Sequence, residues 1–349
     1  MNIERPDLSH VDPAVRAYVE ALEAEIERLR QLEAPVEEIE VTQAQLETGE
    51  PPTTINVVTI SVGGVAKRTP RHLYSRQRRG GMGVFDLGPP ENDRPAFLAA
   101  ADESQNLILI TNLARAFRLP VRDLPESLVH GRGQSLSAKL SLQSDEHIVV
   151  VLPHHVSGFL AVLSWRGYVR CLPYNIFGES LSPGTALYKV KDFGSPSAAC
   201  WTSGADDLFI ATRLGNAIRF GERLVPVPGC SGIRLEESDA AVAVAAVKPA
   251  VESGVFLLGA DGRGTIRLMS GFAANKAPGG GGKLAMKTDR LINAIGIEPA
   301  DDVLILSRLG KLIRFRASEV PAKEGVVQGV NCIALRADDA VALVNASPP

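Results

Sequence analysis

The sequence has few of the residues that build metal and catalytic centres. Its 349 residues include only 4 cysteines and 6 histidines. The cysteines lie far apart and form no C-x-x-C pair, so we expect reduced, largely buried thiols. His154 and His155 are adjacent, and neighbouring side chains on a strand point to opposite faces, which makes a poor chelate. We therefore predict neither a metal nor another cofactor, and the sequence shows no catalytic set of residues.

Long apolar runs and an excess of positive charge are also missing. The first ten residues, MNIERPDLSH, contain no apolar leader, and no segment is long enough to cross a bilayer. We therefore predict a cytoplasmic protein with no membrane contact. The formal net charge is −3, so affinity for a polyanion has to come from an uneven distribution of charge.

The charge is in fact uneven near the N-terminus. Residues 33–50 contain six glutamates and no lysine or arginine. The basic run 67–79 contains no acid, and its cations are Lys67, Arg68, Arg71, Arg76, Arg78 and Arg79. Because burying an unpaired charge is costly, we expect this run to be exposed. Glycines 80, 81 and 83 then permit positive φ and close approach. The segment suits a loop that binds a polyanion, and taken alone it equally suits a solvated loop without a partner.

An amphipathic helix is predicted within residues 1–34. Asp12-Pro13 is a helix-start signal. Apolar residues then follow at alternating steps of four and three, at Val15, Val19, Leu22, Ile26 and Leu29. The pattern leaves two roles open, pairing between two copies in a homodimer or docking on its own domain. Residues 35–53 are acidic, contain Pro51-Pro52 and are predicted to be a linker.

From Ile55 the sequence repeats. DLFIATRLGNAIRF, from Asp207, and DVLILSRLGKLIRF, from Asp302, share an acid, an apolar strand, a turn and a second strand. Six copies are spaced 47 to 53 residues apart, with turn residues Gly64, Ala114, Gly167, Gly215, Gly262 and Gly310. Each copy is followed by a variable loop and further strand segments. Four strands in each of six units predict an all-β, six-bladed propeller over residues 54–345.

This repeat, with QRRGGMG at residues 77–83, resembles the C-terminal domain of the bacterial DNA gyrase A protein. That family folds as a six-bladed β-pinwheel, a propeller in which neighbouring blades exchange strands. Its signature, the gyrase A box, is QRRGGKG in the first blade, and six of the seven residues match here. The family domain binds duplex DNA around a positively charged rim and bends it. In gyrase this wrap lets strand passage introduce negative supercoils.

The resemblance implies a DNA-contacting role for the box. Arg78 and Arg79 would contact phosphates, Gln77 would hydrogen-bond the DNA backbone or order the loop, and the glycines would allow close approach. Met82 replaces the family's lysine, so one phosphate contact is missing. The full predicted DNA-binding set is Lys67, Arg68, Arg71, Arg76, Gln77, Arg78, Arg79, Gly80, Gly81 and Gly83.

The resemblance also implies a protein that is not an enzyme. Gyrase cleaves DNA through a tyrosine preceded by arginine, and none of the five tyrosines here follows an arginine. We predict a stand-alone domain that binds, bends or wraps duplex DNA without sequence specificity. It would act as an architectural, nucleoid-associated protein or as an accessory of gyrase or topoisomerase IV. The alternative is a propeller scaffold for protein interactions that has lost DNA wrapping.

Two further features each have two interpretations. The repeated arginines Arg118, Arg219, Arg267 and Arg314 would either extend a positive track or pair with repeat acids such as Asp207 and Asp302. We favour the second, because positions shared by repeats tend to serve the fold. The acidic segment 33–50 is either a plain linker or an internal competitor of DNA for the basic loop.

Overall fold

The computed structural model describes residues 50–88, 93–136, 139–249, 254–274 and 277–347, together with Val15 and Val19. The chain divides into two units, residues 1–48 and 49–349. In the first unit Val15 and Val19 are helical. The remainder of the predicted helix and the linker up to residue 49 lie outside the described residues. Within the described part of the chain, no helix is long and apolar enough to cross a membrane.

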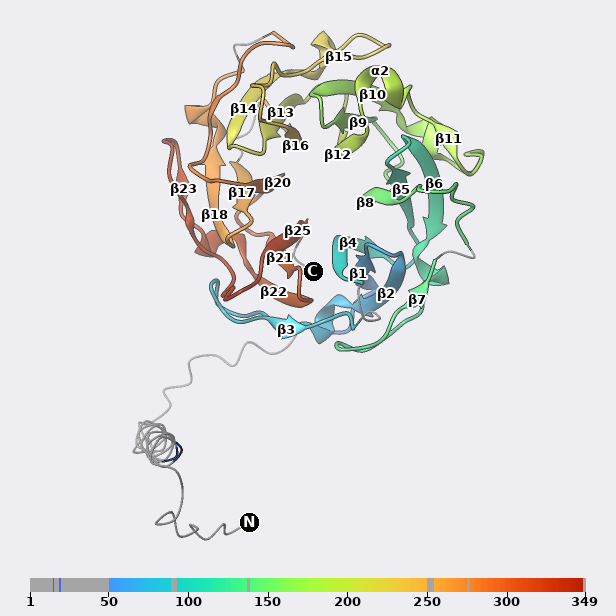
Figure 1. Cartoon of the computed structure of the whole chain (residues 1–349), viewed down its shortest axis with the longest axis vertical. Helices are drawn as coiled ribbons and strands as arrows, with labels where there is room; N and C mark the ends of the chain where they lie inside the picture. Colours follow the sequence, from blue (N-terminus) through green and yellow to red (C-terminus); the bar gives the residue numbers. More distant parts are fainter. Residues whose placement is uncertain are drawn as a thin grey trace. The chain divides into compact units, whose positions relative to one another are not determined.

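The second unit is a ring of six blades in which all strand pairs but one are antiparallel, and this confirms the predicted propeller (Figure 1). From the inside outwards, the first three blades are β4 (Pro95–Asp102), β1 (Ile55–Ser61), β2 (Val65–Pro70) and β7 (Gln134–Ser135); β8 (Ile148–Pro153), β5 (Asn106–Thr111), β6 (Arg115–Pro120) and β11 (Thr185–Ala186); and β12 (Pro196–Thr202), β9 (Phe159–Ser164), β10 (Tyr168–Pro173) and β15 (Cys230–Ser231).

The other three blades follow the same order. They are β16 (Ala241–Val247), β13 (Asp207–Thr212), β14 (Asn216–Gly221) and β19 (Lys283–Leu284); β20 (Leu291–Ile297), β17 (Gly254–Gly259), β18 (Arg263–Leu268) and β23 (Ala322–Lys323), with β24 (Val330–Asn331) also on β18; and β25 (Ala340–Ala346), β21 (Asp302–Ser307), β22 (Lys311–Arg316) and β3 (Val84–Phe85).

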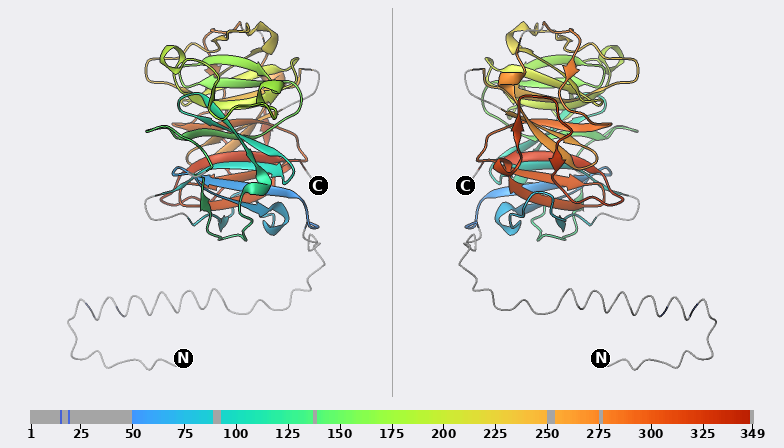
Figure 2. Two further views of the ribbon diagram at one scale, coloured as in Figure 1. Left: turned by 90° about the vertical axis from the view of Figure 1, so that its right-hand side faces the viewer. Right: turned by 90° about the vertical axis from the view of Figure 1, so that its left-hand side faces the viewer.

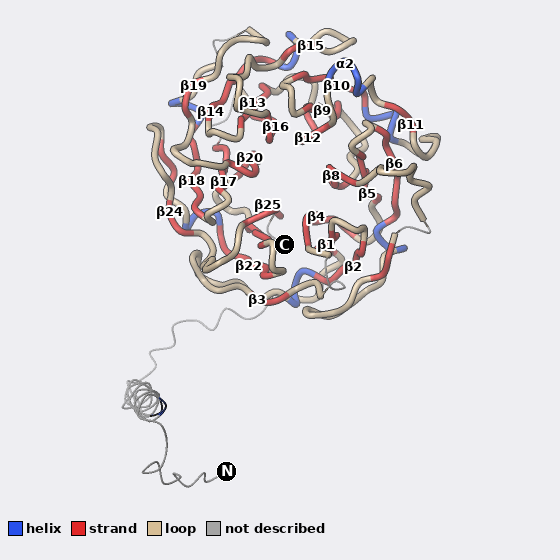
Figure 3. Tube along the Cα trace, in the orientation of Figure 1, coloured by secondary structure: helices blue, strands red, loops and turns tan. Residues whose placement is uncertain are grey.

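Helices are short and lie between strands (Figure 3). They are η1 (Arg71–Leu73), η2 (Val121–Asp123), η3 (Tyr174–Phe177), α2 (Val190–Phe193), η4 (Glu222–Leu224), η5 (Met269–Gly271) and η6 (Ala317–Glu319). Each 3-10 turn directly follows the third strand of its blade and turns the chain toward the next segment.

The hairpin turns explain why the repeat folds in this way. All six predicted turn residues have positive φ, from 54° at Ala114 to 85° at Gly310. Five are glycines, which adopt this region without a steric penalty. The strands on either side are apolar; every residue of β13 and of β21 is buried. The core lies largely between blades, as where Phe209 of β13 packs with Val255 and Leu257 of β17.

Strand exchange joins the blades. In each of the first five blades, the outermost strand comes from the next repeat along the chain. The sixth blade is completed by β3 from the first repeat, where Val84 pairs with Leu312 and Phe85 with Lys311. The first and last blades are therefore neighbours in the ring, as the blue and red segments show (Figure 2). We call this junction the seam.

Candidate nucleic-acid interface

The box, residues 77–83, lies on the seam and is bound to the last blade. The Gln77 amide donates to the Arg314 carbonyl at 2.7 Å, and the Gly80 amide donates to the Cys332 carbonyl at 2.8 Å. In return, the Ala334 amide donates to the Gly81 carbonyl at 2.9 Å. The chain then enters β3, the outer strand of the last blade. The box therefore fastens the two ends of the ring together.

Gln77 and the glycines shape this loop. The Gln77 Oε1 accepts the amide of Gly83 at 3.1 Å, which corresponds to one of the two roles predicted for Gln77, the ordering of the loop. Gly83 has φ +69°, and a Cβ there would lie 2.8 Å from the Leu312 carbonyl oxygen. A Cβ on Gly81 would lie 2.8 Å from the Gln77 Oε1. Gly83 therefore lets the last blade approach the loop closely, and Gly81 leaves room for the Gln77 side chain.

The two box arginines have different surroundings. The Arg79 amide donates to Glu319 Oε2 at 2.9 Å, and its Nε donates to the Glu319 carbonyl at 2.8 Å. Arg78 is exposed, and its side chain makes no hydrogen bond or ion pair within the described ranges. Met82, at the position of the family's lysine, is 58% exposed. Arg78 is therefore the box cation that is available to a partner.

Lys67 and Arg71 lie in the interior, so the prediction of an exposed basic run is wrong at these two positions. The Lys67 Nζ is 2.7 Å from Asp86 Oδ1, and both side chains are fully buried. Arg71 is 2% exposed; its Nη2 is 2.5 Å from Glu50 Oε1, and its Nη1 donates to the Ser347 carbonyl at 2.6 Å. A carboxylate beside each cation offsets the cost of burying it.

Arg68 and Arg76 are partly buried and also face acids. The Arg68 Nη1 lies 2.8 Å from Glu126 Oε2, and the Arg76 Nε lies 2.9 Å from Asp302 Oδ1. The structure thus brings the ten predicted residues together around the first blade and the seam. Most of the positive charges among them are paired with acidic or carbonyl groups of the protein itself.

Glu50 completes an ionic network across the seam, and nothing in the sequence singled it out. Its Oε2 lies 2.6 Å from the Arg314 Nη2, which is also 2.5 Å from Asp302 Oδ2. Burial acts to raise the pKa of Glu50, but hydrogen bonds and charge from Arg71 and Arg314 outweigh it and hold this pKa below its ordinary value. Glu50 belongs to the acidic segment, whose composition indicated only a linker.

Two of the repeated arginines serve the fold, as favoured. Arg219 Nη2 lies 2.8 Å from Asp207 Oδ2, and its Nη1 donates to the carbonyls of Met269 and Phe272 at 3.0 and 3.1 Å. Arg314 uses Asp302 and two carbonyls in the same way. Each arginine therefore links the first residue of the second strand of its own blade to the 3-10 turn of the neighbouring blade.

Exposed cations recur at the periphery, in or beside the outer strands of other blades. Arg132 precedes β7, Lys283 lies in β19 and Lys323 lies in β23, and all three are exposed. The sequence indicated Lys283 only as a neighbour of the glycine-rich segment 278–282, and it gave no signal for Arg132 and Lys323, because only the first blade carries the box.

The described part of the chain holds neither a cluster of metal ligands nor a reactive thiol. No group of three or more His, Cys, Asp or Glu in the described residues is arranged to hold a metal ion. All four cysteines are free thiols. Burial raises the pKa of Cys171 and of Cys332 to about 12, which keeps these thiols protonated and poorly reactive.

A ring of blades that exchange strands, closed by the first repeat, defines a β-pinwheel. The family model described as DNA gyrase C-terminal domain, beta-propeller, matches residues 56–88, 105–155, 206–248 and 301–346. The chain therefore belongs to the DNA gyrase A C-terminal domain family.

Curated relatives are DNA gyrase A proteins. That of Pseudomonas aeruginosa is 27% identical over 93% of this chain and 40% of its own length. That of Escherichia coli is 27% identical over 82% of this chain and 34% of its length, and that of Mycobacterium tuberculosis is 28% identical over 81% and 35%. The chain thus spans about a third to two fifths of the length of these relatives.

Two solved structures share the fold. The C-terminal domain of DNA gyrase A superimposes with a TM-score of 0.74 at 20% identity, covering 83% of this chain and 99% of that domain. The C-terminal domain of DNA topoisomerase IV gives 0.59 at 17% identity, covering 84% and 93%.

Proposed function

We propose that this chain binds duplex DNA through its backbone phosphates and bends it around the outer surface of the pinwheel, without catalysing a reaction. The observation that carries the proposal is Arg78, an exposed arginine on the family's signature loop with no side-chain partner among the residues that the structure describes. A planar guanidinium donates a fork of hydrogen bonds to phosphate oxygens. Such contacts hold DNA without reading its sequence.

At the box, this proposal includes fewer DNA-contacting residues than the sequence predicted, and around the ring it includes more. Lys67 and Arg71 are left out, because both are buried in ion pairs. Gln77 and the glycines act indirectly by holding the loop, while Arg68, Arg76 and Arg79 add charge beside it. Additional phosphate contacts come from Arg132, Lys283 and Lys323, which are exposed at the periphery.

The test is duplex DNA affinity measured against salt concentration. Each phosphate contact contributes about 0.9 to the slope of log K against log salt. Arg78→Gln is expected to reduce this slope by about one and to weaken binding equally for unrelated DNA sequences. Arg166→Gln, which removes an exposed arginine beside Trp165 in the third blade, is the matched control and should leave both quantities unchanged.

A protein-interaction scaffold is the second candidate. Met82 and Phe85 are 58% and 56% exposed beside Arg78, and such apolar side chains favour a protein partner. Absent or salt-insensitive DNA binding would support the scaffold and contradict the first proposal.

The proposed cellular setting is the nucleoid within the cytoplasm, with gyrase or topoisomerase IV as protein partners and a homodimer formed through the N-terminal helix.

Bending and its direction are tested by topology. Relaxed circular DNA is closed by ligase in the presence of the protein and then stripped of it. A shift in linking number would support wrapping, and its sign would give the hand of the wrap. An unchanged distribution with DNA bound would restrict the function to binding.

The acidic segment upstream of Glu50 is proposed to compete with DNA for the basic surface. Its removal should leave Glu50 in place, because Glu50 is 4% exposed and holds Arg71 and Arg314. A chain beginning at residue 49 is expected to bind DNA more tightly at low salt. Equal affinity of the two chains would make residues 33–49 a plain linker.

A further inference from the structure

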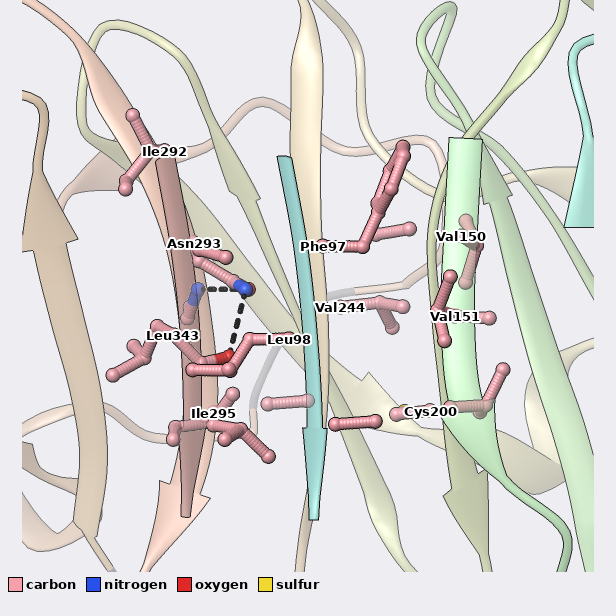
Figure 4. A pocket seen from close by; sticks show the side chains of 18 of the residues that line it. Phe97, Leu98, Val150, Val151, Cys200, Val244, Ile292, Asn293, Ile295 and Leu343 are labelled. Carbon is pink, nitrogen blue, oxygen red and sulfur yellow. Dashed lines mark hydrogen bonds between the residues drawn. The ribbon is translucent and has the colours of Figure 1, made fainter. Parts of the chain in front are cut away.

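The centre of the ring holds a cavity that the proposed DNA surface does not use. The six innermost strands enclose about 410 Å³ of it. Most side chains that line it are apolar, among them Phe97, Val151, Ile292 and Ile295 (Figure 4). Asn293 is a polar exception, and its amide donates to the Leu343 carbonyl at 3.4 Å. The walls combine these apolar side chains with the polar backbone of the innermost strands, and the volume is in the range of small-molecule sites.

One mouth of this cavity is lined by arginines. Arg94 and Arg290 directly precede the innermost strands β4 and β20, and Arg308 lies in the turn between β21 and β22. All three line a second hollow of about 460 Å³. Ala96 and Val341 line both the hollow and the central cavity, so the two spaces adjoin.

The charge at this mouth is net positive among the residues that line the hollow. The carboxylate of Asp339 lies 2.8 Å from the Arg290 Nη2 and 4.0 Å from the Arg308 Nε. The Arg94 side chain is exposed and has no hydrogen bond or ion pair to any residue that the structure describes. Three guanidinium groups thus face one carboxylate.

The opposite mouth carries charges of both signs. The strands β4 and β20 end at or next to Asp102 and Glu298, and Lys248, which follows β16 at the same end, lies 3.4 Å from Glu298. A ligand with one charged end therefore takes its direction in the cavity from the arginines, which attract its anionic end. Carboxylates suit this end because guanidinium groups bind them through paired hydrogen bonds.

We infer that the ring binds a small amphipathic anion, with a carboxylate at the arginine-lined mouth and an apolar body in the central cavity. The innermost strands β4 and β20 have eight and seven residues. They span roughly 23–27 Å at about 3.3 Å per residue, so an extended acyl chain of medium length fits along them. Burial of its methylene groups supplies most of the affinity, and the arginines supply the orientation.

The test is calorimetric titration of the full chain with decanoate below the concentration at which it forms micelles. Binding with a negative change in heat capacity is expected, because apolar surface leaves water. The variant Arg94→Gln/Arg308→Gln is expected to bind at least tenfold more weakly. Both arginines lie at the surface, so this variant should fold, and circular dichroism checks that it does. The matched control Arg166→Gln should bind as the unmodified chain does.

Two ligand controls separate the head from the body. Butanoate has the same carboxylate and six fewer methylene groups, and is expected to bind at least a hundredfold more weakly; at about 0.8 kcal/mol per methylene, full burial of all six would give roughly three-thousandfold. Decyltrimethylammonium carries the opposite charge and is expected to bind at least tenfold more weakly than decanoate. The inference is overturned if decanoate does not bind, if the double variant binds it equally, or if butanoate matches it.

Discussion

The substitution Lys67→Met separates a structural role of the basic run from a role in DNA binding. The Lys67 Nζ lies 2.7 Å from Asp86 Oδ1 and also donates to the carbonyls of Asp86 and Leu128 at 3.0 and 3.1 Å. Both side chains of the ion pair are fully buried. Removing one partner strands a charge in the interior, at a cost of about 3–5 kcal/mol. For a domain of this size, the melting temperature should fall by roughly 6–20 °C.

The assay is thermal and urea denaturation, paired with DNA titration on the same preparations. Lys67→Met/Asp86→Asn removes both charges and is expected to recover at least half of the lost stability. Arg78→Gln should show the opposite pattern, with weaker DNA binding and a free energy of unfolding within about 0.5 kcal/mol of the unmodified chain. If Lys67→Met costs less than about 1 kcal/mol and weakens DNA binding as Arg78→Gln does, the buried ion pair is refuted.

Three other substitutions test the seam and the repeat by urea denaturation. Glu50→Gln should reduce the loss of stability in acid. The pKa of Glu50 in the folded protein lies below the ordinary 4.5, so its carboxylate stabilises the fold above pH 4.5. This contribution is lost as the pH falls through the folded-state pKa. An unchanged pH profile would contradict this. Gly83→Ala should cost at least about 1 kcal/mol, because φ is +69° and the new Cβ would meet the Leu312 carbonyl oxygen at 2.8 Å; a stability equal to that of the unmodified chain would show that the box relaxes. Arg219→Met should cost about 3–5 kcal/mol by stranding the Asp207 carboxylate, and Arg219→Met/Asp207→Leu should recover part of it; no recovery would assign the loss to packing.

The ring could be predicted from the sequence because the residues that define each blade lie close together in the chain and recur in every repeat. Each turn residue stands at the end of a short apolar segment, and a period near 48 residues fixes the number of units. Ala114 shows the strength of the pattern, since it takes the positive φ that glycine has in the other five copies. The exchange of strands between blades came only from the family resemblance.

The surroundings of the basic run could not be predicted, because its partners are distant in sequence. Arg76 and Asp302 are 226 residues apart, and Arg79 and Glu319 are 240 residues apart. No periodicity or spacing rule connects such positions. Glu50 lies in a stretch whose composition is that of a linker, yet it is buried between two arginines. Arg78 alone matched its predicted exposure without an internal partner, because no acid lies opposite it in the described residues.

The completion of the last blade by β3 has a consequence for how the chain folds. Val84 of β3 has left the ribosome long before its partner Leu312 is made. Closing so long a loop carries a large entropic cost, and contacts of high sequence separation form slowly. From the synthesis of β22 until the ring closes, the outer edge of β22 is unpaired, and an open strand edge is a template for pairing with another chain. We therefore expect ring closure to be the slow step of refolding, with exchange of β3 between two copies as the competing product at high protein concentration.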